Sequence, residues 1–104
     1  MNIRFYFQKI EKKDKERLKK YFDNKKLSRL TKLLEKKDLA LAKLTLSAKH
    51  HQRHNIFLVR LGLKITKNDL TSEEKAHSLT GAFDLAFDKL IFQLRKLEDI
   101  KRKR

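Results

Sequence analysis

The segment Leu79-Thr-Gly-Ala-Phe-Asp-Leu-Ala-Phe-Asp-Lys-Leu-Ile-Phe-Gln-Leu-Arg-Lys-Leu97 carries apolar residues at helical spacing. This period predicts an amphipathic helix, which needs a sheet or another helix against which to bury its apolar side. Ser78 or Thr80 can cap the first turn, because hydroxyl oxygens accept hydrogen bonds from the free amides there. The predicted apolar stripe consists of Leu79, Phe83, Ala86, Phe87, Leu90, Leu94 and Leu97.

Segments upstream of this helix alternate between apolar and polar residues, which is typical of half-buried strands. The alternation predicts strands over residues 2–8, 39–49 and 55–65. The polar segment 50–54 is expected to form a hairpin connection between the second and third strands. A weaker fourth strand with the character of a sheet edge is predicted over residues 68–77.

A helical period between residues 12 and 37 predicts a first helix. The step from Phe22 to Leu27 is too long to keep a single apolar stripe, so Asp23-Asn24 marks either a kink or a shift of the buried face. The predicted order is βαβββα, an α+β fold in which a short antiparallel four-stranded sheet carries two helices on one face. A right-handed crossover would place the first helix on that face of the sheet if the first two strands are parallel neighbours.

The opposite sheet face is expected to stay open. Tyr6, together with Ile56 and Leu58, can stack on nucleic-acid bases from this face, although partial burial under neighbouring side-chain stems is the favoured interpretation. The charged and aromatic residues predicted on the open face are Arg4, Tyr6, Lys43, Lys49, Arg60 and Lys64.

The formal net charge of +15 in 104 residues is the strongest feature of the composition. Hydrophobic residues make up 39% of the chain, which is too much for a disordered segment. Segments 9–37 and 89–104 carry most of the positive charge, and segment 67–88 between them is acidic. Such an excess favours a polyanionic partner such as a nucleic acid over solvated lysine-rich helix faces.

Several other functions receive little support. The chain has no cysteine for disulfide or thiol chemistry, and its short apolar runs predict a cytoplasmic protein without a membrane span. Three histidines in the hairpin resemble a metal cluster: His50, His51 and His54. A hairpin would hold their side chains apart, so no metal is expected. If these histidines contact phosphate instead, they would bind it more tightly at acidic pH. Glu73-Glu74 lies on a polar edge without a nucleophile, so neither an enzyme nor a cofactor is predicted.

The segments Leu44-Thr-Leu-Ser-Ala-Lys-His50 and Ala82-Phe-Asp-Leu-Ala-Phe-Asp-Lys-Leu90 resemble the ribosome hibernation promoting factor and ribosome-associated inhibitor A (sigma-54 modulation protein) family. The resemblance implies a βαβββα domain related to double-stranded RNA-binding domains. It also implies a translation inhibitor that binds small-subunit ribosomal RNA near the decoding centre and blocks mRNA and tRNA in idle ribosomes.

The basic residues of the two helices and of the hairpin are the expected contacts to ribosomal RNA. Ile91-Phe92 stands where the family usually has a glutamate-arginine pair, and Thr80-Gly81 stands where it has a tyrosine, so one expected phosphate contact is missing. The candidate RNA-binding residues are Lys25, Lys26, Arg29, Lys32, Lys49, His50, Arg53, Lys89, Arg95, Lys96, Lys101 and Arg102.

Residues 1–100 are predicted to form one ribosome-binding domain and residues 101–104 a short basic tail. The resemblance is to a short form without a C-terminal dimerisation domain, monomeric when free, whose partners are the small subunit, the whole ribosome and neighbouring ribosomal proteins. One alternative is a general double-stranded RNA-binding protein or RNA chaperone. Another is an interaction protein whose lysines bind an acidic partner or a membrane surface.

Overall fold

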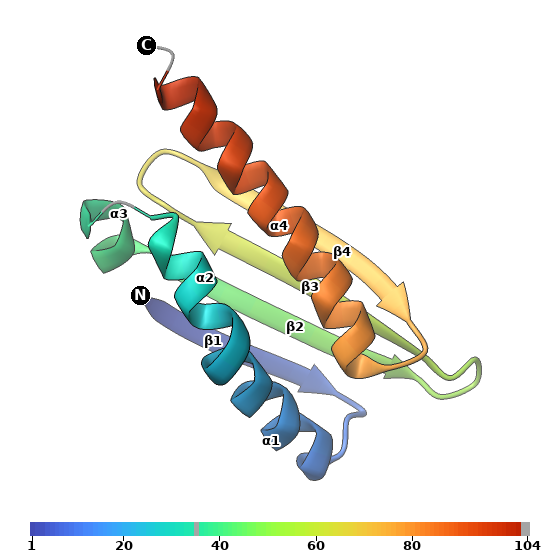
Figure 1. Ribbon diagram of the computed structural model, residues 1–104. Coiled ribbons are helices and arrows are strands. Elements are labelled where there is room, and N and C mark those ends of the chain that lie inside the picture. The colour runs from blue at the N-terminus through green and yellow to red at the C-terminus, as the bar shows by residue number, and fades with distance from the viewer. Residues whose placement is uncertain (35, 103–104) are drawn as a thin grey trace.

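The computed structural model describes residues 1–34 and 36–102, with side chains described for residues 1–34 and 38–100. The chain forms a four-stranded sheet that carries its long helices on one face, as Figure 1 shows. The elements are β1 (Asn2–Gln8), α1 (Lys12–Tyr21), the π-helix η1 (Phe22–Lys26), α2 (Leu27–Lys32), α3 (Lys36–Leu41), β2 (Lys43–His51), β3 (Ile56–Lys64), β4 (Asp69–Ala76) and α4 (Leu79–Arg102).

The sheet order is β1-β2-β3-β4, so each strand pairs with its neighbour in sequence. β1 runs parallel to β2, whereas the β2–β3 and β3–β4 pairs are antiparallel. The predicted α+β class and the four strands are confirmed, but the sheet is mixed rather than wholly antiparallel. The parallel pair requires the helical crossover that carries α1, η1 and α2 over one face of the sheet.

The core lies between this sheet face and the helices. Phe22, Phe83 and Phe87 are fully buried and stack edge-on or tilted against each other. Ile91, one of the residues that depart from the family pattern, is also in the core at 2% exposure, whereas Phe92 is 59% exposed. Burying large apolar side chains is the main term that stabilises a domain of this size.

The long step from Phe22 to Leu27 in the first helix corresponds to a π-turn. The Leu27 amide donates its hydrogen bond to the Phe22 carbonyl five residues earlier, the pattern that defines a π-bulge. This wider turn absorbs one residue, so Leu30 returns to the buried face that Leu18 and Phe22 occupy. The structure therefore assigns the irregularity at Asp23-Asn24 to a shift within a continuing helix.

The predicted strand over residues 39–49 begins too early. The chain forms α3 up to Leu41, and β2 starts only at Lys43. Leu41 is 67% exposed, whereas Asp38 is buried and accepts a hydrogen bond from the Thr66 hydroxyl at 2.7 Å. The small side chains of Ala40 and Ala42 fit either periodicity, so alternation there could not distinguish a helical turn from a strand.

α4 begins where the hydroxyl pattern predicts. The Gly81 amide donates to Ser78 Oγ at 3.0 Å, which makes Ser78 the N-cap. A Cβ atom at Gly81 would lie 2.7 Å from Ser78 Oγ, so the glycine leaves room for this cap. The backbone of α4 continues through Arg102, two residues into the segment expected to be a tail, and residues 103–104 lie outside the described chain.

Candidate nucleic-acid interface

A row of polar contacts joins the first helical segment to α4. The Tyr21 hydroxyl donates to Asp84 Oδ1 at 2.7 Å, and Lys26 Nζ lies 3.6 Å from the same oxygen. One turn further along α4, Arg29 lies 3.5 Å from Asp88 Oδ1. These five residues are called the interhelix seam below.

The two cations of the seam lie near the buried ring of Phe87 and the partly buried ring of Tyr21. Lys26 Nζ is 5.6 Å from the Tyr21 ring centroid and 5.7 Å from that of Phe87, and the Arg29 guanidinium is 6.0 Å from the Phe87 centroid. Cations at such distances are attracted to the faces of aromatic rings. The charged ends of Lys26 and Arg29 therefore lie near both an aromatic ring and an aspartate.

The hydrogen bond to Asp84, with smaller contributions from burial and from the charges of Asp84 and Asp88, raises the pKa of Tyr21 to about 12. A phenol that donates to a carboxylate resists ionisation, because its anion would face that negative charge. The protonated form of Tyr21 therefore holds α1 against α4 at neutral pH.

The candidate cations of the first helix fall into two groups. Lys26 and Arg29 are half-buried in the seam, whereas Lys25 and Lys32 are exposed. Asp84 and Asp88 therefore interrupt the positive charge between the two helices. Lys25 and Lys32 keep their ammonium groups accessible to a polyanion.

The cations of α4 divide in the same way. Lys89 forms an ion pair with Glu74 of β4, so Glu74 is not the freely solvated carboxylate that its sequence position suggests. Arg95 and Lys96 are exposed, and Lys96 Nζ lies 4.6 Å from the centroid of the exposed Phe92 ring. The helix backbone extends to the positions of Lys101 and Arg102, but their side chains lie outside the described part of the structure.

The β2–β3 hairpin brings together the remaining candidates. Lys49, His50 and Arg53 line an open hollow of about 470 Å³, to which Lys9, His51, Gln52 and His54 also contribute. His50 stacks on Phe57 with ring centroids 4.2 Å apart, and its Nε2 lies 3.1 Å from Asn55 Oδ1. The hollow is lined by cationic, imidazole and amide groups, which suits a phosphate.

Lys9 belongs to this hollow, although the sequence pattern did not single it out. It follows β1 and adopts a positive φ of 57°, an uncommon conformation that turns the chain sharply. Neither the turn nor its proximity to the hairpin has a signal in the order of residues. Only the pairing of β1 with β2, through Gln8 and Lys49, brings the two segments together.

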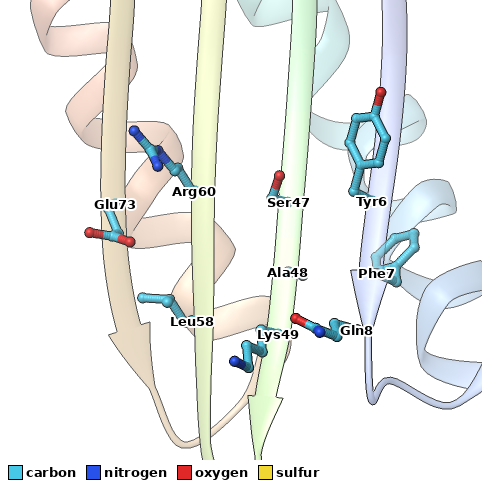
Figure 2. A pocket seen from close by; sticks show the side chains of 9 residues that line it. All are labelled: Tyr6, Phe7, Gln8, Ser47, Ala48, Lys49, Leu58, Arg60 and Glu73. Carbon is cyan, nitrogen blue, oxygen red and sulfur yellow. The ribbon is translucent and has the colours of Figure 1, made fainter.

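A second shallow hollow, of about 530 Å³, lies on the open sheet face (Figure 2). Residues from all four strands line this hollow, and none of its lining residues belongs to a helix. Tyr6, expected to be partly covered, is 53% exposed there. The lining residues are Tyr6, Phe7, Gln8, Ser47, Ala48, Lys49, Leu58, Arg60 and Glu73.

Within the described residues, no group of three or more histidine, aspartate or glutamate side chains is placed to hold a metal ion. No helix in the same part of the chain is long and apolar enough to cross a membrane.

Comparison with known proteins shows the same architecture elsewhere. The N-terminal domain of Thermus thermophilus Protein Y superimposes with a TM-score of 0.75 at 20% identity, covering 93% of this chain and 99% of that one. A ribosomal subunit interface protein from Coxiella burnetii gives a TM-score of 0.72 at 14% identity, with 95% and 99% coverage. A search of curated proteins returned no match.

The sequence profile described as Sigma 54 modulation protein / S30EA ribosomal protein matches residues 3–102. The match spans both helices, the hairpin and all four strands. The family resemblance that the hairpin and last helix predict is therefore confirmed. The chain belongs to the Sigma 54 modulation protein / S30EA ribosomal protein family, which is ribosome-associated and non-enzymatic.

Proposed function

We propose that the protein is a translation inhibitor of idle ribosomes. It binds small-subunit ribosomal RNA near the decoding centre and excludes mRNA and tRNA from that site. Residues 1–100 act as one cytoplasmic domain that binds the ribosome as a single copy. The similarity of the fold to that of the Coxiella burnetii ribosomal subunit interface protein supports this placement.

The observation that carries the proposal is the family match over residues 3–102, which includes both cation-bearing helices. Both helices cover the same face of the sheet, so exposed cations from distant parts of the sequence share one side of the molecule. A net charge of +15 favours a dense polyanion such as folded RNA. Contacts to phosphates position a protein on RNA without reading its sequence.

The test is co-sedimentation of the protein with purified small subunits and whole ribosomes. The variant Arg95→Glu/Lys96→Glu reverses two exposed cations of α4 and should lower ribosome affinity about 10-fold or more. The matched control Lys43→Glu/Lys64→Glu makes the same change in net charge on the opposite sheet face, where both residues are exposed. It should retain at least a third of the affinity.

Competition separates this proposal from general binding to RNA duplexes. Added tRNA should displace the protein from small subunits, and binding should weaken steeply as salt rises. Equal losses in the two charge-reversed variants would refute the helix-side contact. Undiminished binding in the presence of saturating tRNA, with similar affinity for any RNA duplex, would instead establish the general RNA-binding alternative.

A further inference from the structure

The outer face of the sheet, turned away from α1 and α4, is strongly basic. The pairing registers place four rows of side chains on it, one residue from each strand per row. Six of these residues are cationic and two are acidic. The cations are Arg4, Lys43, Lys49, Arg60, Lys64 and Lys75, and the acids are Asp69 and Glu73.

Tyr6 provides an aromatic surface at one end of this face. Its side chain is 53% exposed, and its hydroxyl forms no hydrogen bond among residues 1–34 and 38–100, whose side chains are described. The half-buried Leu58 lies in the adjacent row and supplies an apolar floor to the hollow of about 530 Å³ (Figure 2). Aromatic rings on sheet surfaces are the usual stacking platforms for unpaired RNA bases.

Two cations lie within reach of that ring. Arg60 is in the same row as Tyr6, two strands away, and Lys49 is in the next row on the intervening strand. Strands lie about 4.8 Å apart, so the backbone positions of both residues are roughly 5–10 Å from that of Tyr6 along the sheet. Neither forms an ion pair in the described part of the chain, although Glu73 neighbours Arg60 across β3 and β4.

We propose that this end of the outer sheet face binds an unpaired segment of RNA. One base stacks on Tyr6, and adjoining phosphates lie at Lys49 and Arg60. An acidic peptide would match the charge of this face but would not stack on the exposed Tyr6 ring, so an RNA base is the better occupant. The inference rests on the proposed function only in taking RNA as the partner, because it uses the face opposite the helices.

The test measures binding of a labelled short oligouridine to the full chain by fluorescence anisotropy. Tyr6→Ala should weaken binding about 10-fold, equivalent to about 1.4 kcal/mol, as expected for the loss of one stacked base. Tyr6→Phe keeps the ring and should stay within about 2-fold of the unmodified protein. Phe92→Ala removes an equally exposed ring from the helix side and should leave oligouridine binding unchanged.

Charge variants add a second readout. Lys49→Gln and Arg60→Gln should each reduce the dependence of affinity on salt by about one phosphate contact. Glu73→Gln should tighten binding, because it removes the carboxylate beside Arg60. A circular dichroism melt of each variant checks that the fold is retained. Unchanged affinity in a folded Tyr6→Ala variant overturns the proposal, as does equally effective competition by polyglutamate.

Ribosome sedimentation and oligouridine binding together distinguish failure of the sheet-face site from failure of the proposed function. Arg95→Glu/Lys96→Glu should lower ribosome affinity about 10-fold or more while oligouridine affinity stays within about 3-fold, since those cations lie on the other face. Oligouridine binding that depends on Tyr6, without ribosome binding, refutes only the proposed function. Ribosome binding with an oligouridine affinity indifferent to Tyr6 refutes only the sheet-face site.

Discussion

Replacing Tyr21 with phenylalanine removes one hydroxyl group from the interhelix seam and leaves the ring in place against Phe83. The lost interaction is the 2.7 Å hydrogen bond to Asp84. A hydrogen bond to a charged group contributes about 1.5–3 kcal/mol. Because the Asp84 side chain is 37% exposed, solvent weakens the interaction and about 1–2 kcal/mol is expected. At neutral pH the melting temperature should fall by about 5–10 °C.

The stabilisation by the Tyr21 hydroxyl should decrease as pH rises above the ordinary pKa of tyrosine. The pKa of Tyr21 rises from its ordinary value of 10.0 to about 12 in the folded protein, so the folded state holds the proton more tightly than the unfolded chain does. The stabilisation is therefore complete below pH 10.0 and is lost as pH rises toward about 12. The shift alone would correspond to about 2.7 kcal/mol, which partial exposure again reduces to about 1–2 kcal/mol.

Urea denaturation of the unmodified protein and of Tyr21→Phe, followed by circular dichroism from neutral pH to pH 11, measures both effects. The two proteins differ only in the Tyr21 hydroxyl, so the difference between their unfolding free energies reports on that group. That difference should shrink as pH rises above 10.0. Equal stability at neutral pH, or a difference that does not change with pH, would refute the reasoning.

Two further predictions concern the helices. Deleting Asn24 should convert η1 into regular α-helix and keep Leu18, Phe22 and Leu30 on one face, so the melting temperature should change by less than about 5 °C. A larger drop would show that the π-turn itself is required. Phe92→Ala should change the unfolding free energy by less than about 1 kcal/mol in urea titrations, whereas Phe87→Ala should cost about 3–5 kcal/mol. Similar costs at the two positions would contradict the burial pattern.

The positions of the strands along the chain were predictable because their residues alternate between a buried and an exposed face. Residues 2–8 and 55–65 differ by at most one residue at either end from β1 and β3. The start of β2 was not predictable, because Ala40 and Ala42 fit both periods and the hydrogen bond between Thr66 and Asp38 joins residues distant in sequence. The five-residue step at Asp23-Asn24 signalled an irregularity, but only hydrogen bonding distinguishes a π-turn from a kink.

The candidate cations were predictable as a set but not in their separate roles. Lys26, Arg29 and Lys89 carry the same charge in the sequence as Lys25 and Arg95. Only tertiary packing pairs the first three with carboxylates. The outer-face hollow was predictable in part, since alternation places Tyr6 and Arg60 there, but their spacing depends on strand register.

The seam explains how two basic segments can pack side by side in a chain of charge +15. The part of α4 that contacts the first helical segment is its acidic beginning, where Asp84 and Asp88 face Tyr21, Lys26 and Arg29. Each exposed ion pair contributes only about 0–1 kcal/mol, so the larger effect is that repulsion at the contact is avoided. The basic end of α4 instead extends past α2 in Figure 1, and Arg95 and Lys96 near that end are exposed. This division of charge along one helix lets the fold close while positive charge stays available to RNA.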